Sequence, residues 1–320
     1  MLKAEQQSVQ KSFQEARPKT IQAPFGMALN ELAKKHENVV GLTADLGKYT
    51  DIMPFAAAFP GRYFNVGMAE QNLVAIAAGL AKAGKTPFIT TYGVFATRRA
   101  YDFVAIACAH SNLNVKIFAA QPGLTTSYGA SHQAIEDSAL MRAIPGMTVI
   151  DPCDASEIMQ VVHAAYAIPG TVYVRLQRGN VPIALPEDYR FAVGKAQKIR
   201  DGHELGIIST GITTAHALEA AAVLEANGKS TAILHVPTVK PFDHAAVVAF
   251  AHSVTELVTV ENHIAAGGLA TQVAEALFDA GVLLPLRKIG LPDAFIECGS
   301  PAYLMDKYNI SAAKIAAALS

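Results

Sequence analysis

Apolar residues recur along this chain in two alternating patterns from Pro24 onward. Longer segments carry them three and four residues apart, as one face of a helix requires, and shorter segments are continuous apolar runs, as buried strands require. Such alternation is typical of βαβ units and predicts an α/β protein. In the first half of the chain we expect helices over 25–35, 73–83, 99–109, 136–142 and 155–167, and strands over 39–42, 87–91, 115–120, 148–151 and 171–176.

The alternation stops over 181–201, where prolines and charges replace the periodic pattern, and then resumes. A polar stretch with little periodicity is typical of a linker. We therefore predict two doubly wound domains, over 23–185 and 195–320, the second smaller, after an N-terminal extension over 1–22. In the second domain we expect strands over 205–208, 231–235 and 257–260, and helices over 214–226, 245–251 and 269–280.

Composition and charge limit the class of protein. Hydrophobic residues make up 51% of the 320 residues, which is enough for two packed cores. The 26 basic and 27 acidic residues leave a formal net charge of −1, without a long run of either sign. The sequence therefore predicts neither nucleic-acid nor membrane binding, and no apolar segment has the length of a bilayer span.

Three cysteines, Cys108, Cys153 and Cys298, lie far apart and form no C-x-x-C pair. Because apolar or small residues surround them, we expect buried thiols in a reducing compartment, the cytoplasm. The segment 1–20 lacks the apolar region of a signal peptide, and its glutamates argue against a transit peptide.

The candidate chemistry centres on a carboxylate, since the zincin, P-loop and nucleophile-elbow motifs are all missing. Glu70 stands at the start of an apolar helix, and Tyr92, Phe95 and Arg98 follow in one short segment. An acid there could serve the helix dipole alone, but the aromatic residues favour an acid that faces a flat heterocycle. Asp45 and Tyr92 follow predicted strands, so both should lie at the sheet edge where α/β proteins bind ligands.

Four segments, in this order and spacing, resemble the carboxyl-terminal half of transketolases and of the related deoxyxylulose-phosphate synthases. The resemblance runs from about Phe25 to the end and includes VENH at 260–263 and GGL at 267–269. It implies a thiamine-diphosphate pyrimidine-binding domain followed by a transketolase C-terminal domain. The four segments are GMAEQN at 67–72, YGVFATRRAYD at 92–102, SHQAIED at 131–137 and RGN at 178–180.

By this resemblance Glu70 contacts N1′ of the thiamine aminopyrimidine. A carboxyl group in an apolar pocket keeps its proton more readily, so it can share that proton with N1′ and favour the imino tautomer, whose N4′ takes the proton from thiazolium C2. Tyr92 and Phe95 would pack on the pyrimidine, with Arg98 beside it and Asp45 near the same crevice. The ordinary alternatives are a solvated acid, core aromatic residues and a surface charge.

The resemblance also assigns two substrate contacts. His132 matches the histidine that hydrogen-bonds the donor sugar and its reacting carbonyl. Arg178, just past a predicted strand, matches the arginine that binds a sugar phosphate through its guanidinium fork. A solvated histidine and a surface ion pair are the ordinary alternatives.

At other substrate contacts the chain departs from the family. Tyr128 stands where transketolases commonly have an aspartate that reads a donor hydroxyl, and Gln22 stands for a second phosphate-binding arginine. Tyr49, next to Lys48, stands for a serine, and Ala120 for a histidine. Retained cofactor contacts with changed substrate contacts imply the same chemistry on another sugar. We expect Gln22, Lys48 and Tyr128 to contact an unusual ketose phosphate, such as one branched at C3, of which apulose 4-phosphate is an example.

The sequence contains no Gly-Asp-Gly, the motif that holds Mg²⁺ and the diphosphate in thiamine enzymes. A diphosphate needs a cation with oxygen ligands. The resemblance therefore implies no metal site in this chain, a partner subunit that holds most of the Mg²⁺ site, and an α2β2 assembly with the active site at the interface. Two alternatives stay open, the β subunit of a 2-oxo-acid dehydrogenase and a non-catalytic relative.

Overall fold

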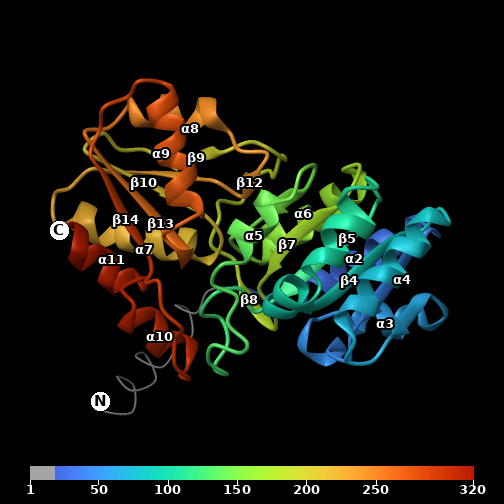
Figure 1. Ribbon diagram of the computed structural model, residues 1–320. Helices are drawn as coiled ribbons and strands as arrows, with labels where there is room; N and C mark the ends of the chain where they lie inside the picture. The colour runs from blue at the N-terminus through green and yellow to red at the C-terminus, as the bar shows by residue number, and fades with distance from the viewer. Residues whose placement is uncertain (1–18) are drawn as a thin grey trace, which may run out of the picture.

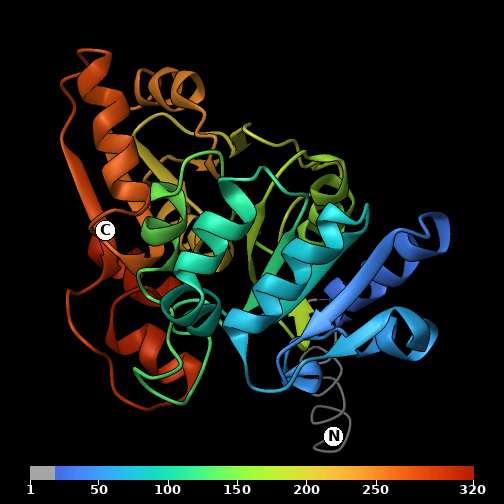
Figure 2. The same cartoon turned by 45° about the vertical axis from the view of Figure 1, so that its right-hand side comes forward.

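The computed structural model describes residues 19–320 as two lobes, each built on a mainly parallel sheet with helices on both faces (Figures 1 and 2). This confirms the predicted α/β class. Most of the expected N-terminal extension, and the segment considered for a targeting signal, lie outside the described residues. Within 19–320 no helix is both long enough and apolar enough to cross a membrane.

The first sheet has seven strands in the order β12-β6-β7-β5-β4-β2-β3. All pairs are parallel except β12 with β6. Strand β12 comes from the second half of the chain, so the second domain extends the sheet of the first. The strands are β2 (Val39–Thr43), β3 (Tyr63–Asn65), β4 (Thr86–Tyr92), β5 (Lys116–Ala120), β6 (Thr148–Ile150), β7 (Val172–Leu176) and β12 (Thr238–Lys240).

Helices cover both faces of this sheet. On one face α2 (Pro24–Lys35) and α6 (Ala155–Ala167) bury their apolar stripes, and on the other α4 (Glu70–Lys82), η4 (Phe103–Ala109) and α5 (Asp137–Ala143) do so. The helix expected over 99–109 is present as the π-helix η4, which follows another π-helical segment, η3 (Phe95–Arg99). Smaller elements are β1 (Thr20–Gln22), which pairs with β8 (Asn180–Pro182), and η1 (Gly47–Tyr49), α3 (Met53–Ala58) and η2 (Pro60–Arg62).

The second sheet has five strands in the order β14-β13-β10-β11-β9, of which only β9 is antiparallel to its neighbour. Helices α7 and α11 pack on one face, and α8 and α9 on the other. The strands are β9 (Gln197–Arg200), β10 (Leu205–Ser209), β11 (Thr231–His235), β13 (Glu256–Ile264) and β14 (Leu286–Leu291). The helices are α7 (Ile212–Ala226), α8 (His244–Ala251), α9 (Leu269–Asp279), α10 (Pro301–Lys307) and α11 (Ala312–Leu319).

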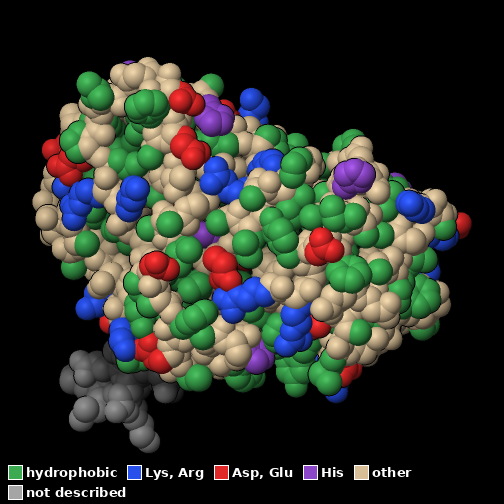
Figure 3. Space-filling view, viewed as in Figure 1, with side chains coloured by type: hydrophobic (Ala, Val, Ile, Leu, Met, Phe, Trp, Pro, Cys, Tyr) green, Lys and Arg blue, Asp and Glu red, His purple; other side chains and the backbone are tan. Residues whose placement is uncertain are grey.

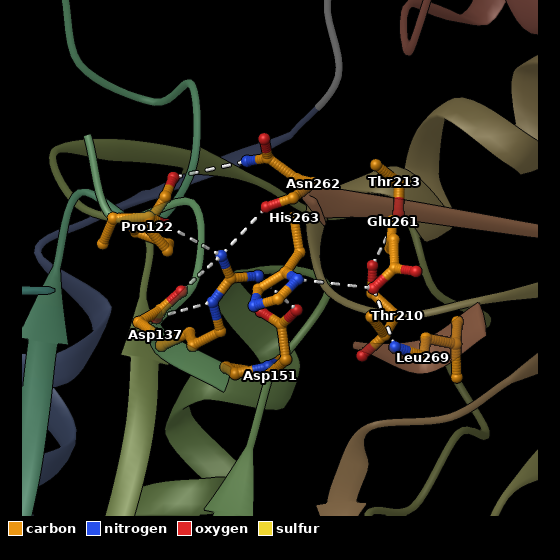
Figure 4. A network of polar contacts seen from close by, with 12 residues as sticks. Pro122, Asp137, Asp151, Thr210, Thr213, Glu261, Asn262, His263 and Leu269 are labelled. Carbon is orange, nitrogen blue, oxygen red and sulfur yellow. Dashed lines mark hydrogen bonds and ion pairs between the residues drawn. The ribbon is translucent and has the colours of Figure 1, made fainter. Parts of the chain in front are cut away.

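A buried arginine, Arg175, joins the two domains, and Figure 4 labels three of its partners, Asp137, Asp151 and Asn262. Arg175 of β7 donates from Nε and Nη2 to the Asp137 carboxylate at 2.9 and 3.1 Å, and from Nη1 to Asp151 at 2.8 Å. Its Nη2 also donates to the Asn262 carbonyl of β13 at 2.9 Å. Two carboxylates and carbonyl groups thus compensate one fully buried guanidinium, as burial of a charge requires.

The end of β13 in turn holds the loop that follows β5. Asn262 Oδ1 accepts from the Leu124 backbone N–H at 3.0 Å, and its Nδ2 donates to the Pro122 carbonyl at 3.3 Å. The Ile264 N–H donates to the Ile135 carbonyl at 2.9 Å. Gly123 leaves room for this clamp, because a Cβ there would lie 2.3 Å from Asn262 Oδ1. The second domain therefore fixes the course of residues 121–137.

One buried carboxyl in this region should make stability depend on pH. Glu261 accepts from the Leu269 and Ala270 N–H groups at 2.7 and 2.9 Å, at the start of α9. Burial nevertheless raises its pKa to about 7. The folded chain therefore binds this proton more tightly than the unfolded chain, and the resulting stabilisation is lost as pH rises from about 4.5 to about 7.

We expect Glu261→Gln, which resembles the protonated form, to gain stability relative to wild type as pH rises from 5 to 8. The full change is at most about 3 kcal/mol, at about 1.4 kcal/mol for each unit of pKa. Urea unfolding at several pH values measures it, with Glu256→Gln, exposed on the same strand, as the control. A stability difference that stays constant over this range would contradict the raised pKa of Glu261.

Candidate active site

The predicted site residues gather at one edge of the first sheet, where its parallel strands end. The segment η3 follows β4 directly, the loop 121–137 follows β5, and Arg178 follows β7 by two residues. Neighbouring parallel strands bring these ends together, which is where open α/β sheets bind ligands.

Glu70 is the first residue of α4, and its side chain is buried. Its Oε1 accepts from Arg99 Nη1 at 3.1 Å, and the Arg99 guanidinium carbon lies 4.0 Å from the centre of the Phe95 ring. The carboxylate therefore lies in an aromatic and cationic surrounding. Because Glu70 forms the first turn of α4, it also lies where the helix dipole favours negative charge.

Arg98 contacts the loop 121–137 in the isolated chain. Its guanidinium pairs with Glu136, through Nη2 at 2.9 Å among other contacts, and donates to the Ala130 carbonyl at 3.1 Å. Arg98 thus holds the loop 121–137, while Arg99, which sequence reasoning missed, reaches Glu70. The π-helical turn of η3 directs these two adjacent arginines to different carboxylates.

Aromatic rings surround His132. Its ring centre lies 5.3 Å from that of Phe95, 5.9 Å from that of Tyr92 and 5.2 Å from that of Tyr128. Ser131 Oγ lies 2.9 Å from His132 Nδ1, which leaves Nε2 for a ligand. Burial and the charge of Arg99 hold the pKa of His132 below its usual value, so the ring stays neutral at pH 7.

Arg178 borders a cavity of about 640 Å³ between the domains, lined also by Gln121 of the first domain and by His216, Met305 and Ser311 of the second. The Tyr49 ring centre lies 6.0 Å from its guanidinium carbon. The first domain therefore presents a cation to an interdomain cavity.

Three further predicted contacts have other neighbours, and two of them lie beside the Arg178 segment, since Gln22 pairs with Asn180 and Lys48 precedes Tyr49. Gln22 and Lys48 line a separate pocket beside Asp51, whose carboxylate accepts from the Gly179 N–H at 2.7 Å. Asp45 is held by Asn65, which donates from Nδ2 to Asp45 Oδ1 at 3.1 Å. The structure thus brings Glu70, Tyr92, Phe95, Tyr128 and His132 together, and their chemical roles stay predictions.

Two family models together match most of the chain. The transketolase pyrimidine-binding domain matches residues 17–184, and the transketolase C-terminal domain matches residues 194–315. Among solved structures, a split-gene transketolase described as an inactive β4 tetramer superposes with a TM-score of 0.85 and 42% identity, over 93% of this chain and 96% of that one.

Known proteins of similar length give the same result. An uncharacterized transketolase family protein of Sinorhizobium fredii is 54% identical, over 93% of this chain and 87% of that protein. A 6-deoxy-6-sulfo-D-fructose transketolase subunit of a Clostridium species is 40% identical, over 90% of this chain and 89% of that subunit. A transketolase C-terminal section from Methanocaldococcus jannaschii is 40% identical, over 93% and 94%.

The residues present suit one half of thiamine diphosphate. A buried carboxylate beside aromatic rings fits an aminopyrimidine, which needs an acid at N1′ and apolar faces above and below. Within residues 19–320 no cluster of three or more His, Cys, Asp or Glu side chains could hold a metal ion. The described residues thus fit the pyrimidine.

The expectation of three buried thiols is wrong for Cys298. Cys108 and Cys153 are buried, but Cys298 is exposed beside the loop 121–137, where the carbonyl of its N-terminal neighbour Glu297 accepts from Gln133 Nε2 at 3.3 Å. The apolar residues around Cys298 belong to a surface loop after β14. The local sequence therefore predicted burial where the thiol is exposed.

We expect one rapidly reacting thiol per isolated chain in a titration with Ellman's reagent under native conditions. Burial raises the pKa of Cys108 to about 12 and that of Cys153 well above its usual value, so neither forms the reactive thiolate. Cys298→Ser should remove the fast phase and Cys108→Ser should keep it. A fast phase that survives Cys298→Ser would contradict the exposure pattern.

Proposed function

Because the chain belongs to the transketolase family, we propose that it is the subunit of a two-subunit, thiamine-diphosphate-dependent transketolase that carries the pyrimidine-binding and C-terminal domains. With a partner that binds the diphosphate and Mg²⁺, it transfers a two-carbon ketol unit from a ketose phosphate to an aldose phosphate. The observation that carries this proposal is the buried Glu70 carboxylate at the start of α4, which pairs with Arg99, whose guanidinium lies over the Phe95 ring.

When bound, the cofactor would supply a carbon nucleophile for a ketose carbonyl, and Glu70, Tyr92 and Phe95 would hold its pyrimidine. The residues of this chain prepare that chemistry. Glu70 would hold a proton at pyrimidine N1′, and the rings of Tyr92 and Phe95 would exclude water from the pyrimidine. Because burial raises the pKa of Tyr92, its phenol stays protonated and neutral.

The substrate residues would act at the sugar. Neutral His132 can donate or accept at a sugar oxygen through Nε2, since Ser131 engages Nδ1. Arg178 would bind the anionic end of the sugar at the mouth of the interdomain cavity. Tyr128 places a half-exposed ring over His132 where an acidic residue would read a hydroxyl, which favours a donor of unusual shape, such as a ketose phosphate branched at C3.

We propose that the partner subunit binds an exposed apolar surface of the first domain. Met68, Phe103 and Ile106 are exposed on the first domain, next to the start of α4 and along η4. Hydrophobic side chains gather over this part of the molecule (Figure 3). Exposed apolar groups beside an incomplete cofactor site are best explained by a partner that completes it. We propose the diphosphate-binding subunit as that partner, in an α2β2 assembly.

We expect Glu70→Gln, in the assembled enzyme, to reduce ketol transfer by roughly 10² to 10⁴-fold, the usual range for loss of general acid–base catalysis. Exchange of the cofactor C2 proton, followed by NMR, should slow by a similar factor. The thermal unfolding midpoint should change little. Glu31→Gln, on the exposed side of α2, is the control. Near-normal exchange in Glu70→Gln would remove the basis of the assignment.

The same assembled enzyme separates this function from the 2-oxo-acid dehydrogenase alternative. We expect glycolaldehyde transfer from ketose phosphates to an aldose phosphate, and no reduction of an artificial electron acceptor with pyruvate. The donor screen should include a branched ketose phosphate, xylulose 5-phosphate and 6-deoxy-6-sulfofructose. Pyruvate oxidation without ketol transfer would overturn the proposal, and equal turnover of xylulose 5-phosphate would remove the case for a branched donor.

We expect Ile106→Glu to weaken assembly with the partner at least tenfold, because it places a charge in the proposed apolar contact. Sedimentation or light scattering of the mixed subunits measures this. Val223→Glu makes the same change at a half-exposed position on α7 and should leave assembly intact. If both variants assemble like wild type, the contact lies elsewhere.

A further inference from the structure

Gln121 is a buried polar residue at the centre of the site that no sequence motif singles out. It follows β5 directly, is 3% exposed and has a φ of 60°. Non-glycine residues adopt this left-handed conformation at a cost, and keep it where their surroundings impose it. The surroundings of Gln121 therefore hold its carboxamide in a defined place.

The carboxamide joins Arg178 to the loop 121–137. Its nitrogen donates to Thr126 Oγ1 at 2.8 Å, and its oxygen accepts from Nε and Nη2 of Arg178, both at 3.2 Å. These partners assign the orientation of the amide, because a guanidinium can only donate hydrogen bonds. Thr126 Oγ1 also accepts from the Tyr128 N–H at 3.4 Å. The contacts thus link the arginine to the segment that carries Tyr128.

These two hydrogen bonds use one side of the guanidinium. Nε has a single hydrogen, and Nη2 gives one of its two, so the edge formed by Nη1 and Nη2 keeps three N–H groups. Two parallel N–H groups on such an edge match two oxygens of a phosphate. Gln121 therefore fixes Arg178 without using the edge that a bidentate anion needs.

Arg178 differs from the nearby arginines because the side chain that holds it, the Gln121 carboxamide, is neutral. In the part of the chain that the structure describes, Arg98, Arg99, Arg142 and Arg175 all pair with carboxylates, whereas Arg178 forms no ion pair within 4.0 Å. A carboxamide orients a guanidinium as a carboxylate does but leaves its charge uncompensated. The positive charge of Arg178 thus stays available to a ligand at the cavity.

We propose that Gln121 is a positioning residue, which orients the Arg178 guanidinium for the phosphate of a sugar substrate and sets the affinity for that anionic group. This inference rests on the proposed role of Arg178 in the transketolase function. It assigns Gln121 no contact with the reacting carbonyl, so the residue should affect phosphate binding and leave proton abstraction at the cofactor unchanged.

The test uses the assembled enzyme with cofactor, and inorganic phosphate as the probe in a ³¹P NMR titration. Gln121→Asn keeps a residue that tolerates the left-handed backbone but shortens the side chain by one methylene, so the carboxamide no longer reaches Arg178. We expect the Kd for phosphate to rise about tenfold, the effect of losing roughly 1.4 kcal/mol of binding. Exchange of the C2 proton should match wild type.

Two further variants make the result specific. Gln121→Glu keeps the length and the acceptor oxygens but neutralises Arg178, and it should also weaken phosphate binding. Gln177→Asn, at the residue before Arg178, is the matched control, because the Gln177 amide donates to the Pro152 and Cys153 carbonyls instead. It should leave the Kd unchanged.

The outcomes separate the two claims. If Arg178→Gln weakens phosphate binding but Gln121→Asn does not, the positioning role is overturned and the proposed function stands. If neither variant changes phosphate binding, the anion role of Arg178 fails and the inference fails with it. Loss of C2 proton exchange in Gln121→Asn would also overturn the inference, because the residue would then support the whole site.

Discussion

The buried guanidinium of Arg175 is the constraint on which the arrangement of the site depends. It binds Asp137 and Asp151 of the first domain and the Asn262 carbonyl of the second, so the two sheets meet at a fixed place. Removing one partner of such a buried ion pair typically costs about 3–5 kcal/mol, because an uncompensated charge remains. The neighbouring Asn262 side chain then fixes the turn after β5. The second domain thereby determines where the loop 121–137 lies in the site.

The charges at this sheet edge follow from the same arrangement. Arg175 is compensated twice and serves the fold, Arg98 ties the loop to Glu136, and Arg99 covers the Glu70 carboxylate in the isolated subunit. Arg178 is held by the neutral carboxamide of Gln121. The edge therefore combines a buried acid, Glu70, with a cation, Arg178, that forms no ion pair among the described residues. These two features suit the pyrimidine of a cofactor at one end and an anionic sugar at the other.

Much of this could be predicted from the sequence, because periodic burial determines local structure. The helix over 155–167 and the strand over 231–235 have the predicted limits, and Glu70 starts an apolar helix as expected. Other features depend on contacts between distant segments, which no local pattern reports. The sequence could not distinguish Arg98 from Arg99, because the π-helical turn decides which one reaches Glu70. It also gave no sign that 238–240 joins the first sheet, that Cys298 is exposed or that Gln121 supports Arg178.

The central claim is that this chain supplies the pyrimidine half of a cofactor site and needs a second polypeptide for the diphosphate half. Calorimetric titration of thiamine diphosphate with Mg²⁺ tests it most directly, once into the isolated chain and once into an equimolar mixture with the partner subunit. We expect no binding by the isolated chain at micromolar concentrations and one cofactor bound per pair of subunits in the mixture. Tight binding of one cofactor per isolated chain would contradict it.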